Sequence, residues 1–206
     1  GGGFGGKSKF FPGEPLAAWC SVQTERPVKW QATRTESHRS DIHGRGRTVQ
    51  AELAFDEDGT IRGLRVDSHA NLGAYVSRAA PGTRTGSFID TMSGQYRIPA
   101  IHCRVRGCLT STTCVDSYRG SSRPMTILTV ERLAKLAADD LGMDPADFRR
   151  RNFIPPEAFP YETPVGETYD SGEYARAMDL ALEHVDYDAL AERRETLREE
   201  GRYLGI

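Results

Sequence analysis

The sequence predicts an α+β fold, because segments with the two-residue period of strands come first and segments with the helical period follow. Apolar and polar residues alternate through residues 49–55 and 61–66, on either side of an acidic turn at residues 56–59. Alternation of this kind gives each strand one buried face, and the Asp-Gly pair in the turn favours a hairpin. From residue 124 onward, apolar residues instead recur with the spacing of one helix face.

The segment before the hairpin is predicted to contain a loop, a helix and a strand. Glycine fills residues 1–6 apart from Phe4, so this opening is a loop or a tight turn. A short helix is expected over residues 14–24, where Pro15 fits the first turn. Residues 28–33 are then expected to form a strand.

After the hairpin, a third strand is expected at residues 101–109, which makes this part mainly antiparallel sheet. A helix then begins at Pro124 and ends before Gly142, a residue type common at helix C-termini. Its buried stripe is predicted to consist of Ile127, Leu128, Val130, Leu133, Leu136, Ala137 and Leu141.

The last part of the chain is predicted to be helical on both sides of one long connector. Asp144 is placed to cap another short helix. The connector covers residues 155–172, which carry four prolines and no periodicity. Two amphipathic helices are expected to follow, near residues 173–184 and 187–199.

Composition narrows the class of protein. The 206 residues include 27 Lys and Arg against 29 Asp and Glu, a net charge of -2, which indicates neither a nucleic-acid partner nor a polybasic membrane anchor. No apolar run approaches the ~18 residues of a membrane span. The four cysteines show no spacing typical of a zinc site, so we expect no protein-bound metal and reduced thiols in a cytoplasmic protein.

The glycine-rich opening carries the first candidate site. Residues 1–8 match the phosphate-loop pattern GxxxxGK[ST]. A phosphate loop must lead directly into a helix, and Pro12 with Gly13 interrupts any helix that starts at Lys7. Besides a nucleotide-binding protein, two interpretations remain: a flexible linker, or a loop whose backbone amides approach a bulky anionic cofactor.

Residues 117–124 form the second candidate site. They are a small-residue loop with two arginines between a strand and a helix. Gly120 gives the backbone freedom, and Ser121 and Ser122 add donors. Such a turn can bring N–H groups and guanidinium groups to one oxyanion or phosphate. The alternative is an ordinary surface loop with two solvated arginines.

Both loops resemble those of a known family. Residues 1–7, GGGFGGK, are similar to the first molybdopterin-contacting loop of the xanthine dehydrogenase and aldehyde oxidase family. Residues 118–124, YRGSSRP, resemble its second loop, usually AYRGAGRPE in the bacterial branch close to aerobic carbon monoxide dehydrogenase. Further similar motifs follow in the order of that branch: RPVKW at 26–30, HGR at 43–45, LGAY at 72–75, YRIPA at 96–100, RRNFI at 150–154, PVG at 164–166 and YDSG at 169–172.

The resemblance implies part of the molybdopterin-binding large subunit of a molybdenum hydroxylase. Residues 1–154 would be the latter part of the first cofactor-binding domain, and residues 155–206 a connector and the start of the second. The cofactor would be molybdopterin with molybdenum, as the cytosine dinucleotide, with FAD on a medium subunit and 2Fe–2S clusters on a small subunit. The residues implied to bind the cofactor are Gly3, Phe4, Gly5, Gly6, Arg119, Gly120 and Ser121.

The implied reaction is a water-dependent oxidative hydroxylation of an aldehyde or an N-heterocycle, in which the cofactor carries the difficult chemistry. Ser8 stands where purine-oxidising relatives have a substrate-binding Glu, which argues against a purine. Gly120 stands where carbon monoxide oxidisers have a copper-ligating Cys, which argues against carbon monoxide. The family's general-base Glu lies outside this chain, so the chain alone is expected to be inactive. A scaffold or interaction fragment without cofactor is the alternative from another class.

Overall fold

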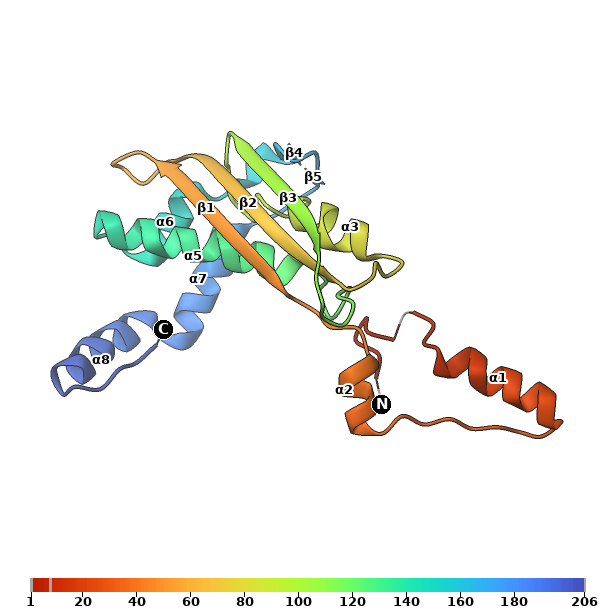
Figure 1. Ribbon diagram of the computed structural model, residues 1–206. Coiled ribbons are helices and arrows are strands. Elements are labelled where there is room, and N and C mark those ends of the chain that lie inside the picture. Colours follow the sequence, from red (N-terminus) through yellow and green to blue (C-terminus); the bar gives the residue numbers. More distant parts are fainter. Residues whose placement is uncertain (1, 8, 206) are drawn as a thin grey trace.

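The computed structural model describes residues 2–7 and 9–205 and confirms the α+β class (Figure 1). Its elements in chain order are α1 (Gly13–Thr24), α2 (Arg34–Ser40), β1 (Arg47–Phe55), β2 (Ile61–Gly73), α3 (Ala80–Arg84), α4 (Gly86–Ile89), β3 (Ile101–Leu109), α5 (Arg123–Leu141), α6 (Pro145–Asn152), the 3-10 turn η1 (Pro156–Ala158), β4 (Tyr161–Glu162), β5 (Thr168–Tyr169), α7 (Tyr174–Val185) and α8 (Tyr187–Glu199).

The main sheet contains β1, β2 and β3 in that order. β1 and β2 form the predicted antiparallel hairpin, with Val49 opposite Ser68. β3 has the predicted bounds but runs parallel to β2, with Val66 opposite Cys103, so the expectation of a mainly antiparallel sheet is wrong for this pair. Parallel neighbours need a long crossover, and α3 and α4, which the sequence did not indicate, lie in it.

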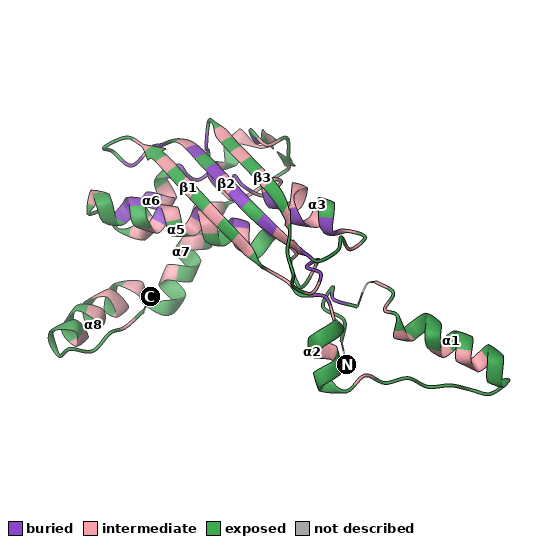
Figure 2. Cartoon of the chain, in the orientation of Figure 1, coloured by how far each residue is buried: buried purple, intermediate pink, exposed green. Residues whose placement is uncertain are grey.

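Helices α5 and α6 cover one face of this sheet, and the hydrophobic core lies between them (Figures 1 and 2). The side chains of α5 that face the sheet include Val130, Ala134 and Ala137, which are buried. Three members of the predicted stripe are exposed instead: Ile127, Leu128 and Leu136, at 55%, 67% and 41% of their surface. The small alanine side chains let α5 pack close to the sheet. Because the alanine face of the helix meets the sheet, the larger side chains point away from it.

Local signals set the ends of α5 and α6 as predicted. α5 ends at Leu141, and its C-cap Gly142 has the left-handed conformation at φ 63°. The Asp144 carboxylate accepts hydrogen bonds from the Ala146 and Asp147 amides at 2.7 and 3.3 Å, which caps α6. At the other end of α6, the buried Asn152 side chain accepts from the Ile61 amide at 2.9 Å and donates to the Gly59 carbonyl at 2.8 Å. Asn152 therefore ties the helix to the hairpin turn.

The N-terminal arm, residues 10–40, departs most from the predictions. α1 forms as expected, but residues 28–33 form no strand, because no strand edge lies beside them in the described structure. Thr33 instead caps an unpredicted helix, α2, through a capping box with Glu36. The arm is fully described, and none of its residues is buried. In Figure 1 it extends away from the sheet.

The C-terminal part contains the two predicted helices, α7 and α8, although no residue of either, all described, is buried. The predicted connector is not wholly irregular, because β4 and β5 pair antiparallel within it, with Tyr161 opposite Tyr169. The four cysteines, all described, are free. Within the described residues, no helix has the length and apolar character that a membrane crossing requires.

Candidate functional site

The first loop of the site, residues 2–7, is a tight turn in which the Gly6 amide donates to the Gly3 carbonyl at 2.9 Å. Gly2, Phe4 and Gly5 have left-handed backbone, at φ 76°, 50° and 88°. At Gly5 a Cβ would lie 3.4 Å from the Ser117 carbonyl oxygen and 3.6 Å from the Arg119 nitrogen. Only glycine takes up this backbone without strain, and the second loop lies within van der Waals contact of it.

The second loop, residues 117–122, lies between the sheet and α5. The Ser121 amide donates to the Tyr118 carbonyl at 2.9 Å, and Ser121 itself has left-handed backbone at φ 55°. Gly120 has φ 82°, and a Cβ there would lie 2.9 Å from the Pro124 ring. The loop therefore keeps its shape because Gly120 leaves room for the Pro124 ring in the first turn of α5.

The two loops touch although 113 positions separate Gly6 from Arg119 in the sequence. The Arg119 amide donates to the Phe4 carbonyl at 2.6 Å. The rings of Phe4 and Tyr118 lie 6.3 Å apart between centroids. The structure thus brings Gly3, Phe4, Gly5 and Gly6 against the loop that carries Arg119, Gly120 and Ser121.

The Arg45 side chain binds the backbone of the second loop. Its guanidinium donates to the carbonyls of Tyr118, Arg119 and Ser121 at 3.0, 2.8 and 2.9 Å. A planar fork of donors suits three carbonyls that converge in this way. Sequence reasoning noted Arg45 only as part of a similar motif and assigned it no role.

Two further arginines lie beside this loop, Arg84 buried and Arg47 half-buried. Arg84 has no exposed surface, and its Nη2 donates to the Arg45 and Gly46 carbonyls. The Arg47 guanidinium lies 4.0 Å from the centroid of the Phe88 ring and donates to Ser68 at 2.8 Å. Burial, followed by the charge of Arg84, lowers the pKa of Arg47 to about 10. Within the described structure, Nε of both arginines and Nη1 of Arg84 are buried without a hydrogen-bond partner.

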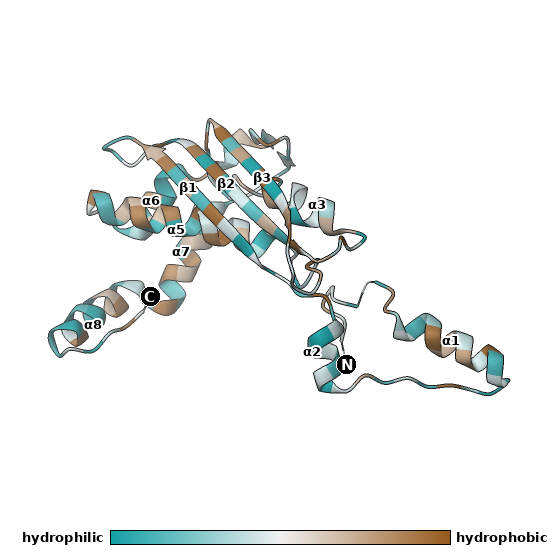
Figure 3. Cartoon of the chain, viewed as in Figure 1, coloured by the Kyte–Doolittle hydropathy of each residue, from teal (hydrophilic) through white to brown (hydrophobic). Residues whose placement is uncertain are grey.

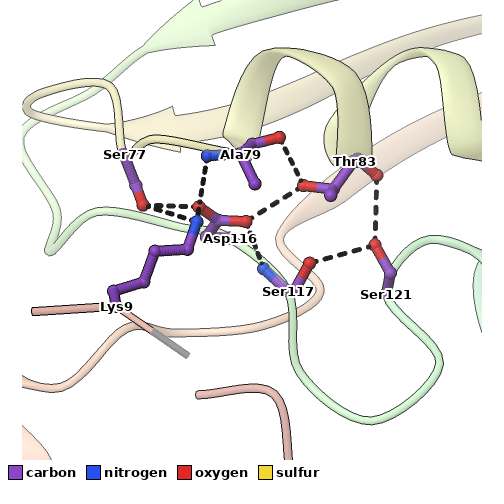
Figure 4. Close-up of polar contacts among 7 residues, drawn as sticks. All are labelled: Lys9, Ser77, Ala79, Thr83, Asp116, Ser117 and Ser121. Carbon is purple, nitrogen blue, oxygen red and sulfur yellow. Dashed lines mark hydrogen bonds and ion pairs between the residues drawn. The ribbon is translucent and has the colours of Figure 1, made fainter. Parts of the chain in front are cut away.

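Asp116 comes directly before the second loop, and its carboxylate binds the first residue of that loop, Ser117 (Figure 4). Its buried carboxylate accepts hydrogen bonds from the side chains of Lys9 and Ser77 and from the Ser117 amide. Burial alone would raise the pKa of Asp116, but these donors, with Lys9 the strongest, outweigh it and hold the pKa at about 2. Asp116 is therefore ionised at neutral pH.

The exposed side chains of the loops differ from these buried supports. The Arg119 side chain is exposed, as is 55% of Phe4. Ser121 is half-buried, and its hydroxyl lies 3.3 Å from the Thr83 carbonyl.

Ser8, on which the argument against a purine substrate rests, lies outside the described residues, as does Gly1. Sequence reasoning missed Asp116 and Lys9, although the place of Asp116 immediately before the loop was a usable signal.

A cavity of about 680 Å³ opens beside Lys9 and the start of the arm. It is lined by Lys9, Phe10, Phe11, Pro12, Arg39, Ser40, Ile42, Tyr75, Ser77, Arg78, Thr113 and Cys114. Across the described residues, no three His, Cys, Asp or Glu side chains lie close enough to hold a metal ion.

The phosphate-loop interpretation is not supported by this geometry. A nucleotide site requires a helix that begins at the Lys of the motif, so that its first amides face the phosphates. Here the first helix, α1, begins at Gly13, beyond Pro12. Lys9, rather than Lys7, is the lysine that the fold buries.

Comparison with known proteins identifies relatives of this site. The family model described as "Molybdopterin cofactor-binding domain" matches residues 1–153. The chain is 39% identical over 191 residues to the carbon monoxide dehydrogenase large chain of Hydrogenophaga pseudoflava, covering 92% of this chain and 24% of that one. It is 34% identical to the 6-hydroxypseudooxynicotine dehydrogenase complex subunit gamma of Paenarthrobacter nicotinovorans, covering 100% of this chain and 26% of that subunit.

Solved structures show the same likeness. Quinoline 2-oxidoreductase from Pseudomonas putida 86 superposes with a TM-score of 0.90 at 30% identity, over 98% of this chain and 26% of that one. Reconstituted CO dehydrogenase from Oligotropha carboxidovorans gives 0.87 at 34% identity, over 97% and 25%. The chain thus spans about a quarter of the length of the proteins that it matches.

Proposed function

Because the chain belongs to the molybdopterin cofactor-binding domain family, we propose that its two loops hold part of the molybdenum cofactor of a larger hydroxylase subunit. The observation that carries this proposal is the hydrogen bond from the Arg119 amide to the Phe4 carbonyl at 2.6 Å. A glycine-rich turn and a small-residue turn that are far apart in the sequence meet there. Left-handed backbone at non-glycine residues such as Phe4 and Ser121 costs free energy, and such strain is typical of ligand-binding sites and not of a scaffold.

The described residues fit such a cofactor. Left-handed backbone at Gly5 and Gly120 lets both turns fold tightly, and because neither residue has a side chain a bulky group can come close to the loop backbone. The Arg119 guanidinium is exposed on the second loop and offers a fork of donors to oxygen atoms. Arg45 fixes the carbonyls behind the loop, so these donors are placed before the ligand arrives.

The bound cofactor would supply the redox chemistry of a water-dependent hydroxylation, while this chain positions it. We propose that it is the cytosine dinucleotide form of molybdopterin, and that partner subunits carry FAD and 2Fe–2S clusters. An aldehyde or an N-heterocycle is the proposed substrate. Relatives whose names include nicotine hydroxylase and quinoline oxidoreductase support the N-heterocycle. Gly120 has no thiol to bind copper, so carbon monoxide is not proposed.

The test uses a full-length subunit that contains this chain and replaces Arg119 by Ala. The molybdenum content should fall by about tenfold, because a hydrogen bond to a charged group is worth about 1.5–3 kcal/mol. Arg132→Ala is the matched control, since Arg132 is an exposed arginine on α5 outside the loops. Full molybdenum content in the Arg119→Ala subunit, measured by elemental analysis, would contradict the proposal.

A further inference from the structure

The first loop has few attachments to the rest of the protein. Of its described residues only Gly6 is buried, and the arm that follows, residues 10–40, has no buried residue in the described structure. Apart from the contacts of Phe4 and Gly5 with the second loop, the firm attachment of this segment is Lys9. The Lys9 side chain is only 13% exposed and forms an ion pair with Asp116.

Asp116 is attached to the body as well as to Lys9 (Figure 4). One carboxylate oxygen accepts from the Thr83 hydroxyl at 3.0 Å and from the Ser117 amide at 2.6 Å. The other accepts from Lys9, from the Ser77 hydroxyl and from the Ala79 amide at 3.3 Å. Its side chain has no exposed surface.

The placement of the pair in the sequence matters as much as its burial. Lys9 stands two positions after the first loop, and Asp116 directly precedes the second. A single ion pair therefore joins the end of one loop to the start of the other. The network continues into the second loop, because the Ser117 hydroxyl lies 3.5 Å from that of Ser121, which in turn lies 3.3 Å from the Thr83 carbonyl.

We propose that Asp116 is a positioning residue that holds the two loops in register with each other through Lys9. A charged hydrogen bond between buried groups fixes geometry more firmly than exposed contacts do. Without it, the first loop would depend on its contacts with the second loop, next to an arm that has no buried residue in the described structure. The effect of Asp116 on the cofactor rests on the proposed function, whereas its effect on the loops does not.

The first test measures amide hydrogen exchange in the full-length subunit, purified without cofactor, with Lys9→Met and Asp116→Asn. Peptides over residues 2–12 and 117–122 should exchange about tenfold faster, a factor that corresponds to ~1.4 kcal/mol. Peptides of β1 should be unchanged. Lys9→Arg keeps the charge and should restore slow exchange. Lys135→Met, which removes the exposed ion pair with Asp139, is the control.

Unchanged exchange in residues 2–12 would overturn the proposal. So would equal acceleration in β1, because Asp116 would then only stabilise the fold as a whole. Molybdenum content of the loaded subunit separates this proposal from the preceding one. A fall of about tenfold in Lys9→Met, reversed in Lys9→Arg, supports both. Loosened loops with full molybdenum content would leave Asp116 as the positioning residue and refute the cofactor role of the loops.

Discussion

The body of the molecule, residues 47–153, and the N-terminal arm, residues 10–40, contain similar amounts of regular structure for their length but bury very different surfaces. Phe148 in the body is fully buried, whereas Trp19 in the arm is 60% exposed. Figure 2 shows buried residues along the sheet and α5 but none in α1, although Figure 3 shows that α1 contains hydrophobic residues. Secondary structure therefore forms from local signals in both regions, but packing stabilises only the body.

The pattern of apolar residues explains why the body is packed and the arm is not. In β1 they fall on one face, and that face meets α5. Six large apolar side chains of the arm are at least 40% exposed: Phe10, Leu16, Trp19, Val22, Val28 and Trp30. No second layer of the described chain packs against them. A helix without a packed face is only marginally stable by itself.

The largest expected effect comes from the centre of the body. Phe148→Ala should lower the free energy of unfolding by about 3–5 kcal/mol, because it leaves a cavity where the Phe148 ring meets Phe55 edge-on. Trp19→Ala, a comparable loss of an aromatic ring in the arm, should change it by less than about 0.5 kcal/mol. Urea unfolding followed by circular dichroism measures both, and equal effects would refute the contrast between the regions.

A smaller effect is expected from a buried polar link in the body. Asn152→Ala should cost about 2–3 kcal/mol, because the Ile61 amide and the Gly59 carbonyl lose their partner away from water. Arg151→Ala removes a neighbouring exposed ion pair with Asp58 and should cost about 1 kcal/mol or less. Thermal unfolding of the two variants distinguishes them, and a similar melting temperature would contradict the role of Asn152.

The junction between arm and body should show a dependence on pH. The pKa of Asp116 is about 2 in the folded protein, against 3.8 ordinarily, so the folded state binds this proton less readily. Asp116 therefore contributes about 2 kcal/mol above about pH 4, and the contribution is lost as the pH falls toward about 2. The stability difference between wild type and Asp116→Asn should shrink over that range. A constant difference in urea unfolding from pH 6 to 2 would exclude this linkage.

The smallest effect should be confined to the arm. Thr33→Ala removes the capping box of α2 and should destabilise that helix by about 1 kcal/mol. Because α2 contributes no buried residue, the melting temperature of the body should not change. Hydrogen exchange of residues 34–40 against that of β1 provides the measurement. Cooperative loss of both would show that arm and body fold as one unit.

The sequence by itself determined the elements whose signals are local. Alternation predicted the hairpin of β1 and β2, the bounds of β3 were read directly, and Gly142 and Asp144 marked the helix ends. The resemblance of two motifs identified the residues of both loops. The assignment of residues 1–154 and 155–206 to two domains remains a prediction, as do the roles of the individual loop residues.

The tertiary structure alone decided what depends on neighbours distant in the sequence. The direction of β3 follows from the crossover through α3 and α4, and the exposed side of α5 follows from which stripe meets the sheet. Residues 28–33 have the composition of a strand but no partner edge, so they form none. The contact of the loops and their link through Lys9 and Asp116 join positions more than a hundred residues apart. Periodicity and caps report interactions within a few residues, whereas hydrogen bonds between distant segments exist only once the chain has folded.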